Sequence, residues 1–89
     1  MKTKELKLRI YNGGTSVLSV DLEIEANECL VPPKEAIIVH AICSEDVEPA
    51  TLELHWFETG LSIYPPGRAS QCIDFFVTLN GVRIAPISG

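Results

Sequence analysis

His40 and His55 are the only two histidines, and either could act as a metal ligand or a general base. A catalytic zinc usually takes three protein ligands, often histidine together with a carboxylate. The two histidines could sit on neighbouring strands, with Glu53 or Glu58 close by. No short-spaced pair such as H-x-H or H-x-x-x-H exists, so a structural role is favoured for both. We therefore expect no metal ligands and no cofactor.

Three cysteines, Cys29, Cys43 and Cys72, could supply a nucleophile or a disulfide. A nucleophilic thiol needs a base and an electropositive setting to lower its pKa. Cys43 follows His40 by three residues, so in a regular strand the two side chains lie on opposite faces. An odd number of cysteines cannot close into a complete intrachain framework, and no pair has C-x-x-C spacing. We expect free thiols that pack as small hydrophobic side chains, without a catalytic cysteine.

Asp74 has the most unusual context among the acidic residues, because it interrupts a strongly apolar stretch. A regular strand would place its side chain on the same face as Cys72 and Phe76. A partly buried carboxylate is costly unless it is paired, and Arg68 or Arg83 could pair with it. The sequence therefore predicts a structural ion pair at Asp74, and no catalytic residue is assigned anywhere in the chain.

Aromatic side chains and a guanidinium gather near a Pro-Pro-Gly turn in the second half of the chain. The candidate binding residues are His55, Trp56, Tyr64 and Arg68, which could line a shallow pocket or form a protein contact. Trp56 shares a strand face with Leu54, which favours a place in the core for this ring. Tyr64 and Arg68 are therefore the stronger candidates for a surface role.

Alternating hydrophobicity predicts strands along most of the chain. Residues 5–11 and 17–25 alternate with period two on either side of a turn at 12–15, which predicts an antiparallel hairpin. Its outward faces would set basic residues against acidic ones, an arrangement that favours pairing. Residues 36–43 are a continuous apolar run, which is typical of a strand covered on both faces.

Two further hairpins are predicted from their turns. Residues 50–57 and 61–64 flank a three-residue loop that ends at Gly60, where a positive φ is needed. The Asn80-Gly81 pair tolerates the positive φ angles of a type I′ turn. The second turn sets a register that places Leu79 opposite Val82, Val77 opposite Ile84, and Phe75 opposite Pro86.

The predicted fold is all-β: a small antiparallel β-sandwich or barrel of about seven to eight short strands, in one domain over residues 1–89. Hydrophobic residues make up 46% of the chain, which is much apolar surface for a small core to bury. An open sandwich also leaves strand edges that pairing between subunits can close. Both features predict a homo-oligomer.

The charge balance narrows the choice of partners. With a net charge of −5 and seven lysine and arginine residues, the chain is poorly suited to nucleic acid or to an anionic membrane surface. Free thiols, and the lack of an apolar leader or a membrane-length apolar run, favour a cytoplasmic location.

The favoured function is a non-enzymatic interaction or structural protein that self-associates. The alternative is a small-ligand-binding β module with a pocket near Trp56, Tyr64 and Arg68. A protein or a small molecule is therefore the expected partner.

Overall fold

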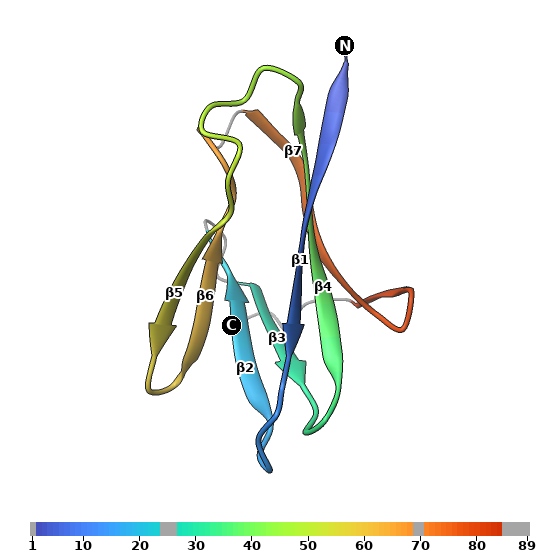
Figure 1. Ribbon diagram of the computed structural model, residues 1–89, viewed down its shortest axis with the longest axis vertical. Coiled ribbons are helices and arrows are strands. Elements are labelled where there is room, and N and C mark those ends of the chain that lie inside the picture. The colour runs from blue at the N-terminus through green and yellow to red at the C-terminus, as the bar shows by residue number, and fades with distance from the viewer. Residues whose placement is uncertain (1, 24–26, 69–70, 85–89) are drawn as a thin grey trace.

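The computed structural model describes residues 2–23, 27–68 and 71–84, which form two packed β-sheets (Figure 1). The strands are β1 (Thr3–Tyr11), β2 (Leu18–Leu22), β3 (Asn27–Val31), β4 (Ala36–Ser44), β5 (Glu53–Phe57), β6 (Gly60–Tyr64), β7 (Cys72–Leu79) and β8 (Val82–Ile84). The first sheet has the order β1-β4-β7-β8, and the second has the order β3-β2-β6-β5. These ranges contain no α-helix. The predicted small β-sandwich is confirmed.

The predicted hairpin between residues 5–11 and 17–25 is wrong. β1 pairs with β4 in the first sheet, whereas β2 is central in the second sheet, antiparallel to β3 and parallel to β6. The basic side chains of β1 therefore lie beside β4, with Lys7 in register with His40, and not beside the acidic residues of β2. The alternation of apolar and polar residues could not reveal this pairing. The same face of each strand is buried whether the two strands form a hairpin or lie in different sheets.

Asn12 holds the point where the chain crosses from the first sheet to the second. Its Nδ2 donates to the carbonyl oxygens of Ser16 at 2.8 Å and Val31 at 2.9 Å, and its Oδ1 accepts from Gly14 N–H at 3.0 Å. The side chain is buried, at 6% exposure. Its backbone N–H donates to Glu35 O, which ties the same corner to the loop before β4.

β4 lies between β1 and β7, and its burial alternates along its length. Ile37, Val39, Ala41 and Cys43 are completely buried and face the core between the sheets. The intervening residues, including His40, are half-buried beneath neighbouring side chains on the outer face of the sheet. The sequence predicted a strand covered on both faces, because apolar residues occupy most of both faces of β4. In the structure, only the face toward the core is fully enclosed.

Both predicted C-terminal hairpins form, but the β5–β6 loop has two residues and not the predicted three, because Gly60 already pairs with Phe57. In β7–β8, Val77 pairs with Ile84 and Leu79 with Val82, while Asn80 and Gly81 have φ angles of 52° and 81°. The predicted partner Pro86 lies outside the described residues.

In β5–β6, Phe57 pairs with Gly60, which has a φ of 149°. A Cβ at this glycine would lie 2.3 Å from the carbonyl oxygen of Ser19 on β2. Gly60 therefore serves both the turn and the close approach of two strands.

A bulge changes which side chains face the core at the start of β7. Ile42 is in register with Asp74, but Cys43 is in register with Cys72, so the pairing skips Ile73. Cys72 consequently packs in the same apolar cluster as Cys43 and Val47. The prediction that Asp74 and Cys72 share a face is wrong, because it assumed a regular strand.

Candidate functional site

Three polar side chains from adjacent strands are linked on the outer face of the first sheet. His40 Nδ1 on β4 lies 3.0 Å from Glu5 Oε2 on β1, and His40 Nε2 lies 2.8 Å from Thr78 Oγ1 on β7. The His40 side chain is 12% exposed. The order carboxylate, imidazole, hydroxyl has the connectivity of an orienting acid, a base and a nucleophile.

A stacked layer covers this histidine. The Phe76 ring lies parallel to the His40 ring, with centroids 4.7 Å apart and an interplanar angle of 2°. The Arg83 guanidinium carbon lies 4.3 Å from the Phe76 centroid. Arg83 also donates from Nη1 to Asp74 Oδ2 at 3.0 Å and from Nη2 to Asp74 Oδ1 at 3.1 Å. The predicted ion pair of Asp74 is therefore confirmed, with Arg83 as the partner.

The linked groups connect three neighbouring strands of the first sheet. The hydrogen bond from His40 lowers the pKa of Glu5, which keeps that carboxylate charged and bound to the imidazole. The cavity of about 400 Å³ between the two sheets is lined by neither His40 nor Thr78. The two contacts of His40 join β4 to β1 and to β7 through side chains.

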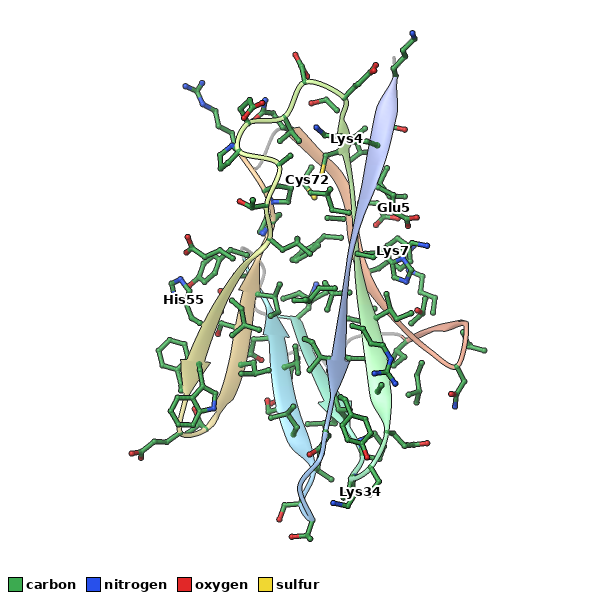
Figure 2. All side chains as sticks on the ribbon, in the orientation of Figure 1. Lys4, Glu5, Lys7, Lys34, His55 and Cys72 are labelled. Atoms are coloured by element: carbon green, nitrogen blue, oxygen red, sulfur yellow. The ribbon has the colours of Figure 1, made fainter. Side chains whose placement is uncertain are left out.

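The two histidines do not lie on neighbouring strands. His40 belongs to the first sheet and His55 to the second. Figure 2 shows Glu5, which binds His40, and His55 on opposite sides of the molecule. Within the described residues, no group of three or more histidine, cysteine, aspartate or glutamate side chains could hold a metal ion.

The second candidate site lies on the β5–β6 hairpin and only partly matches the prediction. The His55 ring contacts Tyr64, with centroids 4.7 Å apart, and Phe57 at 6.3 Å. His55 Nε2 also pairs with Glu53 Oε2. Arg68 lies in the turn after β6, where its backbone N–H donates a hydrogen bond. The structure therefore brings His55 and Tyr64 together, whereas Arg68 is not among the contacts of these rings.

Trp56 does not lie in the core, contrary to the prediction. Its side chain is 75% exposed, and Leu54 on the same strand face is 44% exposed. Their neighbour Ile63 on β6 is fully buried, so this face does point toward the interior of the sandwich. Figure 1 shows that the β5–β6 hairpin extends away from β1 and β4. Trp56 is exposed because β5 ends its sheet beyond the reach of the opposite one.

A cavity of about 400 Å³ opens between the two sheets, away from the predicted binding residues. Cys29 lines it from the second sheet, and Phe75 and Ile84 line it from the first. Asp74 and Arg83, whose side chains pair with each other, are also among its lining residues. Sequence reasoning missed this cavity because strands distant in sequence build it, and no local pattern indicates which strands will face each other.

Burial makes all three thiols weaker acids. Desolvation is the largest cause that raises the pKa of Cys29, Cys43 and Cys72, and the pKa of Cys72 reaches about 11. All three are free in the structure. This setting is the opposite of the one that activates a catalytic cysteine.

Comparison with protein-family models, curated proteins and solved structures found no match. Among the described residues, no helix is long and apolar enough to cross a membrane.

Proposed function

We propose that this chain is a non-enzymatic interaction protein that self-associates through the β5–β6 hairpin. One observation carries the proposal: three large apolar side chains are exposed on a single five-residue strand. Leu54, Trp56 and Phe57 are 44%, 75% and 50% exposed. Monomeric proteins seldom leave large apolar side chains clustered on their surface, and tryptophan is enriched at the centres of protein interfaces.

The backbone of β5 supports the same proposal. Among the described strands, β5 ends its sheet and pairs only with β6. A terminal strand presents unpaired N–H and C=O groups along its free edge, and a strand from another chain can bind there. The hairpin thus combines free hydrogen-bonding groups with apolar side chains, which together suit the addition of a strand.

A second copy of the chain fits this edge. Antiparallel pairing of two β5 strands about a two-fold axis at His55 would place each Leu54 opposite Trp56 of the second copy. Each Glu53 would lie opposite Phe57 of the second copy, so the two carboxylates would not oppose one another. The arrangement matches large apolar side chains with each other and avoids a repulsive pair.

The size of the edge predicts weak association. A standard interface buries roughly 800 Å² on each partner, and five strand residues with three exposed apolar side chains supply less than that. We expect a dimer with a dissociation constant on the order of 10 µM. Such a dimer forms at high protein concentration and dissociates on dilution.

Sedimentation velocity over a concentration series tests the proposal. From about 0.5 to about 500 µM, the weight-average mass should rise from near that of the monomer to near that of the dimer. Trp56→Ser should hold the protein as a monomer across that range. Val82→Ser is the matched control, because Val82 is 68% exposed but lies on β8 in the other sheet. A monomer at every concentration, or an unchanged dimer with Trp56→Ser, would refute self-association through this hairpin.

The cavity between the sheets favours a second candidate function, that of a small-ligand-binding module. Its volume of about 400 Å³ is within the usual range for ligand pockets. Apolar lining residues such as Phe75 and Ile84 suit a small ligand with an apolar body. This candidate replaces the pocket expected near Trp56, Tyr64 and Arg68.

The fluorescent probe 1-anilinonaphthalene-8-sulfonate tests the cavity. Saturable binding that persists in Trp56→Ser but disappears in Ile84→Trp, which fills the cavity, would support a ligand module. Binding that is lost in Trp56→Ser would assign the probe to the exposed hairpin and argue against the cavity.

A further inference from the structure

Two of the three cysteines are cross-strand partners at one end of the first sheet. Cys43 on β4 is in register with Cys72 on β7. Opposite residues in antiparallel strands have Cα atoms about 4.5–5.5 Å apart, which falls within the range that a disulfide spans. The bulge at Ile73 creates this pair, because a regular strand would set Ile73 opposite Cys43 and turn Cys72 to the other face.

Both thiols lie in the same apolar cluster. Cys43 is fully buried, and Cys72 is half-buried in the same apolar cluster with Ala41 and Val47. Figure 2 shows Cys72 between the two sides of the sandwich, near the loop that follows β4. The two thiols interact directly, and the contact lowers the pKa of Cys43 while raising that of Cys72. The Cys72 Sγ–H donates its proton to the carbonyl oxygen of Asp74 at 3.5 Å.

Cys29 cannot form a disulfide with either of these cysteines, because it lies in the other sheet. It lies on β3 in the second sheet, opposite Val20 of β2. Packed sheets are separated by about 10 Å, which is farther than a disulfide reaches without backbone movement. The unpaired third cysteine is therefore a built-in control.

We propose that Cys43 and Cys72 are a redox modification site, at which a small-molecule disulfide such as oxidised glutathione converts the two thiols into a cross-strand disulfide. This bond would join β4 to β7 covalently at the end of the sandwich that carries the 45–52 loop. The proposal is independent of self-association through β5.

The reaction proceeds by two thiol–disulfide exchanges. The Cys72 thiolate, from the more exposed cysteine, attacks one sulfur of oxidised glutathione. The glutathione S–S bond breaks, a mixed disulfide forms on Cys72, and one glutathione thiolate leaves. The Cys43 thiolate then attacks Cys72 Sγ, forms the protein disulfide and releases the second glutathione. Each thiol gives up one proton, the two cysteines lose two electrons, and oxidised glutathione gains them.

Incubation of the full chain with oxidised glutathione at mildly alkaline pH tests the proposal. Intact-mass spectrometry should show the loss of two hydrogens, and alkylation after denaturation should label one cysteine instead of three. Peptide mapping should link Cys43 to Cys72, with Cys29 alkylated. Cys29→Ser should leave the oxidation unchanged, and Cys72→Ser should abolish the loss of two hydrogens.

Three results would overturn the proposal. These are full alkylation of all three cysteines after incubation, a stable glutathione adduct on Cys72 without the internal bond, and a link that includes Cys29. Circular dichroism on Cys72→Ser checks that this variant keeps its β structure. If it does not fold, the peptide map of the wild-type chain decides the question alone.

Discussion

Asn12 offers the sharpest test of how the two sheets are held together. Asn12→Ala removes three side-chain hydrogen bonds, to the carbonyl oxygens of Ser16 and Val31 and from Gly14 N–H. The residue is only 6% exposed, so water has little access to replace the lost bonds. Two carbonyl groups and one N–H group would be left without their partners at the corner where the chain changes sheets.

The size of the effect follows from these bonds. Each net hydrogen bond contributes about 1 kcal/mol, so we expect Asn12→Ala to lower the free energy of unfolding by about 3 kcal/mol. For a domain of this length, that loss lowers Tm by about 12–24 °C. Asn12→Asp should be less stable still, because one carboxylate oxygen would face the two carbonyl oxygens that now receive N–H groups.

Urea unfolding followed by far-ultraviolet circular dichroism measures both variants. Circular dichroism is preferred to tryptophan fluorescence because Trp56 is 75% exposed in the folded state. All samples should be at one low concentration, since dimer formation would add apparent stability. Thr15→Ala, at an exposed position in the same loop, should change stability by less than about 0.5 kcal/mol. A loss below about 1 kcal/mol for Asn12→Ala would refute the assigned role.

Three further predictions follow from individual residues. Gly60→Ala should lower the free energy of unfolding by more than about 2 kcal/mol in urea titration, because its Cβ would lie 2.3 Å from a carbonyl oxygen; an unchanged midpoint would contradict the observed strand contact. Alkylation of Cys72 by iodoacetamide, followed by mass spectrometry, should quicken about tenfold per pH unit from pH 7 to 10, because its pKa is about 11; a plateau near pH 8 would contradict that value. The hydrogen bond with His40 lowers the pKa of Glu5 below 4.5 in the folded protein. The charged Glu5 should therefore stabilise the fold above pH 4.5, and this contribution should disappear as the pH falls through the lowered pKa of the folded state. Glu5→Gln should remove this pH dependence in thermal melts.

The two C-terminal hairpins could be predicted because their information is local. The Asn80-Gly81 turn needs positive φ angles, and a two-residue loop then sets the register of the strands on both sides. Gly60 similarly indicated the β5–β6 turn. The ion pair of Asp74 was predictable because a carboxylate within an apolar strand needs a nearby cation.

The candidate site was harder to predict, because exposure depends on distant strands. Trp56 follows the apolar alternation of a core residue, yet it is 75% exposed. The contact between His40 and Thr78 joins strands that are far apart in sequence. No residue spacing within β4 or β7 indicates that these two side chains will meet.

The amino-acid sequence alone determined the all-β class, the approximate number of strands and the inward face of β1, because side-chain alternation is a property of each strand by itself. Tertiary structure decided which sheet each strand joined, that β2 would pair in parallel with β6, and that Cys72 would meet Cys43. These outcomes depend on the free energy of packing whole strands against one another. That free energy is shared among residues far apart in the chain, so no short stretch of sequence carries it.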